Sequence, residues 1–174
     1  YYKQPYIAVY RSNYLLENVD LISEITDEEK NRMTAEARFI RVLCHFDLVR
    51  LFSHPYGYTP NNSHNGIIIK TTTNPDPKPR NSVGEVYDFM ISELIEISNL
   101  LPESNGNYAN KYAAHALLAK IYFQTNQLDL AINETNEVIN CGIYSLDIGI
   151  TKRNAVNKYS RDNSYPLKCI SKKI

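Results

Sequence analysis

The segment from Asp27 to Phe52 is predicted to form one long helix with apolar side chains on two opposite sides. Thr26 and Glu29 have the spacing of a capping box at its start, and Pro55 follows soon after its end. One apolar side consists of Phe39, Val42, Phe46 and Val49, and the other of Met33, Ala37, Cys44, Leu48 and Leu51. A helix with two apolar sides is buried between neighbours, so the chain is expected to fold as a stack of helices.

Two narrow charged stripes separate the apolar sides of this helix. They contain Glu36, Asp47 and Arg50 on one side and Arg38, Arg41 and His45 on the other, at 100° per residue. These charges are expected to pair with each other or with neighbouring helices. Asp47 and Arg50, three residues apart, predict a surface pair that contributes only a few tenths of a kcal/mol.

The remaining helices are predicted from apolar residues at helical spacing over 6–22, 83–101, 109–125 and 128–141. Ser82 is a candidate N-cap for the helix at 83–101, and Gly142 a candidate terminator after the last one. Residues 53–82 form a long loop, in which the apolar run 66–71 predicts a brief strand or an extended packing segment. After Leu146 the periodicity fades, and the basic tail 147–174 is expected to be irregular and poorly ordered.

Residues 118–139 match the tetratricopeptide repeat pattern at several fixed offsets. The matching positions are Leu118, Ala119, Tyr122, Asn126, Leu128, Ala131 and Val138. Small residues such as Ala119 and Ala131 let two helices cross closely, while larger ones fill the gaps beside them. The predicted fold is therefore all-α, with antiparallel helix pairs of tetratricopeptide type in a right-handed α-α superhelix and one long loop excursion. The helical domain covers residues 1–146.

Charge and motifs exclude several classes of function. The 19 basic and 19 acidic residues give a formal net charge of zero, which argues against nucleic acid as a partner. No phosphate-binding loop, nucleophile elbow or zinc-protease motif occurs, so neither an enzyme nor a cofactor is predicted. His54 and His64 share a loop but lack a third metal ligand at suitable spacing, so no metal site is predicted.

The start of the long loop, residues 53–66, holds the candidate ligand-binding residues. They are Tyr56, Tyr58, Asn61 and Asn62. Tyrosine rings can stack on the C–H face of a sugar, and asparagine amides can hydrogen-bond its hydroxyl groups. The alternative is a purely structural loop, in which a tyrosine packs on the helix end and the asparagines form turns.

Several blocks of this sequence, taken in order, resemble the SusD/RagB family of surface glycan-binding lipoproteins from Bacteroidetes. The blocks are "YRSNYLLENVD" (10–20), "AEARFIRVLCHFDLVRLF" (35–52), "GIIIK" (66–70), "PRNSVGEVYDFMISELIEISNLLP" (79–102) and "NKYAAHALLAKIYFQTNQLDLAINETNEVINCGIYSL" (110–146). The resemblance covers about residues 6–146.

This resemblance implies a non-catalytic component of a nutrient importer. Such proteins bind an oligosaccharide, or in some members a peptide, and pass it to a TonB-dependent SusC-like transporter. They lie on the surface of the outer membrane and are held there by a lipidated N-terminal cysteine, which this chain does not contain. Two alternatives stay open from the residues alone: a tetratricopeptide adaptor that binds a protein or peptide, and a non-functional remnant that still folds.

Overall fold

The computed structural model describes residues 2–146 and 170–172 of the chain. The helices of these residues are α1 (Lys3–Asn18), α2 (Asp27–Phe52), α3 (Val83–Ser98), α4 (Lys111–Gln124) and α5 (Leu128–Asn140). A short 3₁₀ turn, η1 (Val19–Leu21), follows α1, and a second, η2 (Pro60–Asn62), lies in the long loop. Strands β1 (Tyr144–Leu146) and β2 (Ile170–Lys172) pair antiparallel. The predicted irregular tail 147–174 lies outside the described residues, except for β2.

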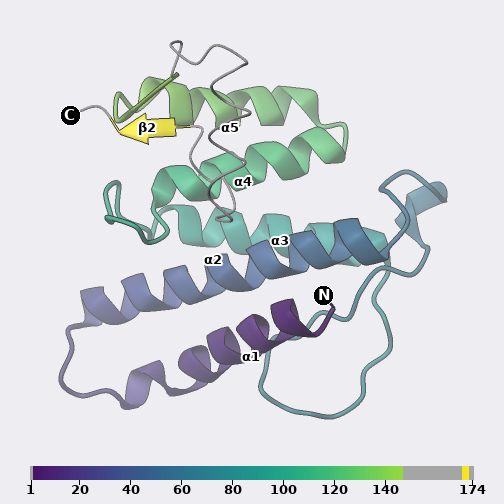
Figure 1. Cartoon of the computed structure of the whole chain (residues 1–174), viewed down its shortest axis with the longest axis horizontal. Coiled ribbons are helices and arrows are strands. Elements are labelled where there is room, and N and C mark those ends of the chain that lie inside the picture. The colour runs from purple at the N-terminus through teal and green to yellow at the C-terminus, as the bar shows by residue number, and fades with distance from the viewer. Residues whose placement is uncertain (1, 147–169, 173–174) are drawn as a thin grey trace, which may run out of the picture.

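The five helices lie on one another in chain order, each antiparallel to the next (Figure 1). Helix α2 contacts both α1 and α3, and α4 contacts both α3 and α5. Within residues 2–146 and 170–172, the strands form one short pair at the edge of this stack. The prediction of an all-α fold built from tetratricopeptide-type helix pairs is confirmed.

Two capping boxes fix where helices begin. The backbone N–H of Glu29 donates to Thr26 Oγ1 (3.2 Å), and the N–H of Thr26 donates to the Glu29 carboxylate (2.9 Å). Ser82 and Glu85 make the same reciprocal pair at the start of α3. Each box satisfies N–H groups that have no partner within the helix, so the predicted helix starts are confirmed.

Helix boundaries differ from the prediction by a few residues. Helix α3 ends at Ser98 rather than at residue 101, although Leu101 is still buried. Its last turn tightens, since Leu100 and Leu101 both donate to the carbonyl of Ile97. Pro102 disfavours the helical conformation at Leu101, so the helix cannot continue past this turn.

The apolar sides of α2 face its two neighbouring helices, as predicted. Val42 and Leu48 are fully buried, and Phe46 and Val49 are nearly so. Leu51 is the exception, with 70% of its surface exposed in the last turn of the helix. Helix α2 therefore anchors the core between α1 and α3.

The apolar run 66–71 is an extended packing segment rather than a regular strand. Gly66 N–H donates to the Asn81 carbonyl (2.7 Å), and Asn81 N–H donates to the Ile67 carbonyl (2.9 Å). Ile67 is fully buried, and the Tyr6 hydroxyl of α1 donates to the Ile68 carbonyl (2.8 Å). A Cβ at residue 66 would lie only 3.0 Å from the Asn81 carbonyl oxygen, so glycine permits this close approach. These contacts hold residues 66–68 of the long loop against its last residues and against α1.

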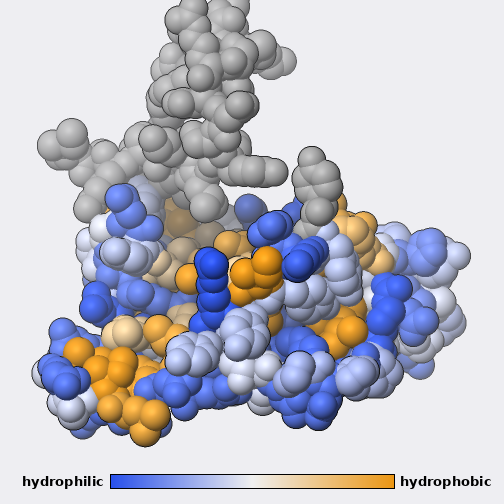
Figure 2. Space-filling view, turned by 60° about the horizontal axis from the view of Figure 1, so that its bottom comes forward, coloured by the Kyte–Doolittle hydropathy of each residue, from blue (hydrophilic) through white to orange (hydrophobic). Residues whose placement is uncertain are grey.

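The face formed by α1 is mainly hydrophilic, with apolar side chains gathered over the turn that leads from α1 to α2 (Figure 2). Leu21 in η1 is among the most exposed apolar residues described. None of the helices described is long and apolar enough to cross a bilayer.

Candidate functional site

The loop after α2 folds into an ordered aromatic cluster. The rings of His54 and Tyr58 stack with centroids 4.2 Å apart and an interplanar angle of 10°. His64 meets Tyr58 edge-on at 5.4 Å, and its Nε2–H donates to the His54 carbonyl (3.2 Å). Thr59 Oγ1 lies 2.8 Å from His64 Nδ1 and so donates to it. These contacts hold the Tyr58 ring in one position at the surface.

Two of the four predicted ligand-binding residues lie at the surface. Tyr58 is 59% exposed, so its ring remains accessible although it stacks on His54. Asn61 is also exposed, in a left-handed backbone conformation with φ of 55° that asparagine tolerates. Their side chains are available to a ligand.

The other two predicted residues support the loop. Tyr56 is half-buried and packs edge-on against Tyr87 of α3 at 5.0 Å. Asn62 is buried, and its Oδ1 accepts a hydrogen bond from the Gly57 N–H (2.5 Å). The structure thus brings all four residues into one loop but gives Tyr56 and Asn62 internal contacts.

A small cavity of about 270 Å³ adjoins this loop, a feature that sequence reasoning missed. Its lining includes Arg50, Ser53, Tyr56, Tyr87 and Gln124, from the ends of α2 and α4, the loop and α3. Burial raises the pKa of Tyr87, which keeps its hydroxyl protonated, and this hydroxyl donates to Gln124 Oε1 (2.8 Å). The periodicity of α2 and α4 does not reveal that their last turns meet here.

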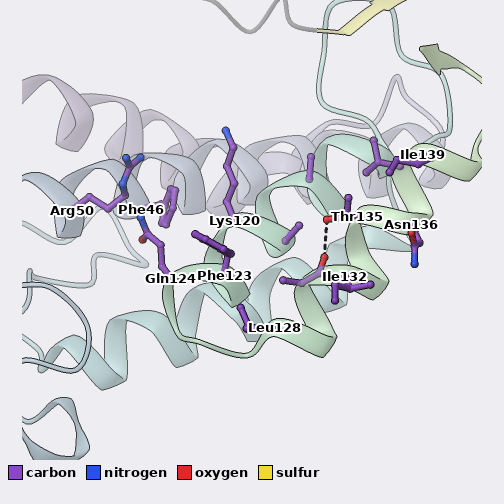
Figure 3. A pocket seen from close by; sticks show the side chains of 14 residues that line it. Phe46, Arg50, Lys120, Phe123, Gln124, Leu128, Ile132, Thr135, Asn136 and Ile139 are labelled. Carbon is purple, nitrogen blue, oxygen red and sulfur yellow. Dashed lines mark hydrogen bonds between the residues drawn. The ribbon is translucent and has the colours of Figure 1, made fainter. Parts of the chain in front are cut away.

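A larger groove of about 950 Å³ runs between α4 and α5 and reaches α2 (Figure 3). Its apolar lining includes Ala119, Phe123, Leu128, Ala131, Ile132 and Ile139. Several of these residues belong to the tetratricopeptide pattern of α4 and α5. Among the described residues, no further helix covers the groove side of this helix pair. The long side chains of Phe123, Ile132 and Ile139 are mostly exposed.

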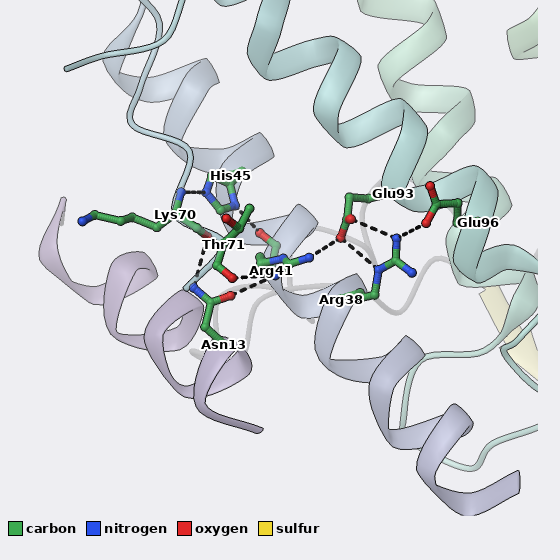
Figure 4. Close-up of polar contacts among 8 residues, drawn as sticks. All are labelled: Asn13, Arg38, Arg41, His45, Lys70, Thr71, Glu93 and Glu96. Carbon is green, nitrogen blue, oxygen red and sulfur yellow. Dashed lines mark hydrogen bonds and ion pairs between the residues drawn. The ribbon is translucent and has the colours of Figure 1, made fainter. Parts of the chain in front are cut away.

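A buried polar network joins α1, α2 and α3 (Figure 4). Arg41 pairs with Glu93 of α3 and donates to Asn13 Oδ1 of α1 (3.0 Å). Arg38 also binds Glu93, at 2.9 Å. Burial alone would raise the pKa of Glu93, but hydrogen bonds from both arginines outweigh it and hold this pKa below its usual range. Perturbed groups can mark a catalytic site, but these are paired with one another inside the core and hold the helices together.

His45 belongs to the same network and is fully buried. Its Nδ1–H donates to the Arg41 carbonyl (2.7 Å), and its Nε2 accepts from the Lys70 N–H (3.2 Å). The bond from Lys70 needs the neutral ring, because a protonated ring carries a hydrogen on Nε2 and cannot accept there. Burial is the main cause that lowers the pKa of His45 to about 4, and the Arg41 charge adds to it.

Mild acid is therefore expected to destabilise the protein through His45. The unfolded state binds a proton near the usual pKa of 6.5 and the folded state only near 4, so stability is lost as the pH falls through this interval. The free energy of unfolding should fall by about 2 kcal/mol between pH 7 and pH 5. Urea denaturation of the wild type and of His45→Gln measures this. The loss should be much smaller in the variant, and equal losses in the two proteins would contradict the assignment.

The described residues contain no group of three or more His, Cys, Asp or Glu side chains able to hold a metal ion. His115 of α4 pairs with Glu134 of α5 at 2.6 Å, which links these two helices.

The candidate functional site is the surface of the loop 53–66 together with the cavity beside it.

The chain is similar in sequence to SusD-like proteins. A SusD-like family model, described as "Starch-binding associating with outer membrane", matches residues 1–123. A SusD-like protein of Formosa agariphila is 28% identical over 149 residues, which cover 83% of this chain and 27% of that protein. A SusD-like protein of Bacteroides ovatus is 25% identical over 173 residues, 91% of this chain and 30% of its own length. The chain thus spans less than a third of the length of these relatives.

Solved structures agree with the sequence comparison. A SusD superfamily protein from Bacteroides thetaiotaomicron superposes with a TM-score of 0.74 and 32% identity, over 82% of this chain and 32% of that one. A protein described as a putative sugar-binding protein from Bacteroides vulgatus gives 0.70 and 33%, over 78% and 31%. The fold alone is shared with a laminarin-binding SusD-like protein, at a TM-score of 0.64 and 23% identity. This match covers 80% of this chain and 29% of that protein. The family is described by binding rather than catalysis, in agreement with the prediction that the chain is not an enzyme. The chain belongs to the SusD-like (SusD/RagB) family, and the resemblance seen in the sequence is confirmed.

Proposed function

We propose that this chain binds an oligosaccharide through the exposed aromatic surface of the loop 53–66, without catalysis. One observation carries the proposal: the Tyr58 ring is held by His54 and His64 and is still 59% exposed. An aromatic ring fixed in this way presents a flat apolar face to sugar C–H groups at little cost in conformational entropy. Asn61 beside it supplies hydrogen bonds to hydroxyl groups. Tyr56 and Asn62 contribute by keeping the loop in shape.

In the cell, the proposed role is capture of a glycan for a TonB-dependent SusC-like transporter at the outer membrane. The family description, which joins starch binding to the outer membrane, supports this role. The full-length protein is then anchored by a lipid at the cell surface. A helical stack suits such a role because it holds the loop on a rigid support.

Tyr58→Ala is expected to weaken oligosaccharide binding about tenfold or more, because the stacking surface is lost. Isothermal titration calorimetry with maltoheptaose and laminarihexaose measures the affinity. Tyr58→Phe keeps the ring and should bind within about twofold of the wild type. Tyr10→Ala removes an exposed tyrosine of α1 and should leave binding unchanged. Equal affinities of the wild type and Tyr58→Ala would refute the proposed surface.

A second candidate function is a tetratricopeptide adaptor, and the apolar groove between α4 and α5 favours it. An amphipathic helix with apolar residues at i, i+4 and i+7 fits such a groove. The two functions respond differently to mutation. Ile132→Asp in the groove would abolish binding of a helical peptide and leave oligosaccharide binding intact, whereas Tyr58→Ala would do the reverse.

A further inference from the structure

We propose that the cavity beside the loop binds one sugar residue that carries a carboxylate, a uronate within or at the end of an oligosaccharide. The inference rests on the proposed function, since it names the kind of glycan that the same loop region selects.

The cavity has the size of a subsite for a single sugar ring. Its volume of about 270 Å³ lies just below the range of about 300–1,000 Å³ that is typical of pockets for drug-sized ligands. His54 lines the cavity and also stacks on Tyr58, so the cavity and the exposed aromatic surface adjoin. One oligosaccharide can therefore contact both.

Two neutral polar groups at the cavity have no partner among the described residues. Ser53 Oγ is buried without a hydrogen bond. The Gln124 amide accepts from Tyr87 through its oxygen, which leaves its Nε2–H groups without a partner in the part of the chain described. A buried polar group without a partner is costly, so Ser53 Oγ indicates a place where a ligand hydroxyl group completes the hydrogen bonding. Gln124 is exposed, so its amide N–H groups can donate to the same ligand.

Arg50 gives the cavity its charge. It is the one residue with a permanent charge among the described residues that line the cavity. Arg50 also borders the larger groove, where its guanidinium lies 5.0 Å from the centre of the Phe46 ring. Its ion-pair partner, Asp47, is 3.9 Å away and both side chains are about half exposed, so this pair is weak. The N–H groups of Arg50 are thus available to a carboxylate, which matches the fork of a guanidinium.

Aromatic rings complete the fit to a sugar. Tyr56 and Tyr87 meet edge-on at one side of the cavity and offer an apolar wall to a pyranose ring. The cavity therefore combines this wall with the polar groups of Ser53 and Gln124 and the guanidinium of Arg50. These groups match a hexuronate better than a neutral hexose, because only the carboxylate of the uronate can form an ion pair with Arg50.

The test compares two ligands that differ only at C6, methyl β-glucuronide and methyl β-glucoside. Each is titrated into the isotope-labelled full chain and followed by NMR, including the side-chain amide of Gln124. The glucuronide should bind about tenfold more tightly than the glucoside, because a hydrogen bond to a charged group is the stronger one. Arg50→Gln should abolish this preference, and Arg50→Lys should retain part of it. Arg11→Gln removes an exposed arginine of α1 and serves as the matched control.

Equal affinity for the two ligands, or a preference that survives in Arg50→Gln, would overturn the inference. If neutral maltoheptaose still bound in a manner that depends on Tyr58, the proposed function would stand while the uronate site failed. If the glucuronide bound through Arg50 and Tyr58→Ala had no effect on the binding of maltoheptaose or laminarihexaose, the uronate site would stand and the exposed surface would fail. Absence of binding by every glycan would overturn both.

Discussion

Replacing Glu93 with alanine is expected to lower the free energy of unfolding by about 3–5 kcal/mol, the largest effect of a single ion-pair change in this chain. The Glu93 side chain is only 14% exposed, and it neutralises Arg41, which is 7% exposed, and Arg38. Without Glu93 two guanidinium groups remain buried without their shared carboxylate. Urea denaturation followed by circular dichroism measures the change.

Glu96 provides the control for this prediction. It also binds Arg38, but it is 59% exposed, so Glu96→Ala should cost less than about 1 kcal/mol. Similar losses for the two variants would show that the Glu93 network does not hold the helices together.

A triple change of Arg38, Arg41 and Glu93 to Met, Met and Leu should recover much of the stability that Glu93→Ala loses, since buried ion pairs are often replaceable by apolar residues.

Leu48→Ala is expected to cost about 2–5 kcal/mol, because it leaves a cavity in the middle of the helix stack. Leu48 is fully buried on the side of α2 that the sequence predicted to be covered. The same denaturation experiment measures the effect.

Leu51 lies three residues further along α2 and is 70% exposed, so it offers a matched control. Leu51→Ala should change the free energy of unfolding by no more than about 0.5 kcal/mol. A large loss in Leu51→Ala, or a small one in Leu48→Ala, would mean that the two apolar sides of α2 are assigned to the wrong environments.

Local signals predicted the helices well. The capping box at Thr26–Glu29 and the N-cap at Ser82 lie within single turns, so they could be predicted from sequence spacing, whereas the reciprocal bond from Glu85 was seen only in the structure. The two apolar sides of α2 followed from its periodicity, but the exposure of Leu51 did not. Periodicity identifies which side of a helix is apolar and not how far the neighbouring helix extends along it.

The pairing of charges was predicted only in outline. The sequence placed Arg38, Arg41 and His45 on one stripe, and these charges were expected to pair with each other or with neighbouring helices. The partner Glu93 lies 52 residues from Arg41, and contacts over such a separation depend on the packing of α2 against α3. His45 binds backbone groups instead, which no charge pattern indicates.

The candidate site was predicted by composition and refined by geometry. Tyrosines and asparagines between two helices marked the loop, and the structure places Tyr58 and Asn61 at its surface. The internal contacts of Tyr56 and Asn62 depend on Tyr87 and on the path of the loop, which composition does not determine. The cavity at Arg50, Ser53 and Gln124 combines residues from three separate elements and required the structure.

Chemical-shift mapping of the labelled chain with maltoheptaose and laminarihexaose tests the central claim most directly. One or both glycans should shift the amide signals of His54, Tyr58 and Asn61, with smaller changes at Ser53, which lines the cavity and not the groove. Shifts confined to the apolar groove of α4 and α5, or no shifts with any glycan, would contradict a glycan-binding site on the loop 53–66.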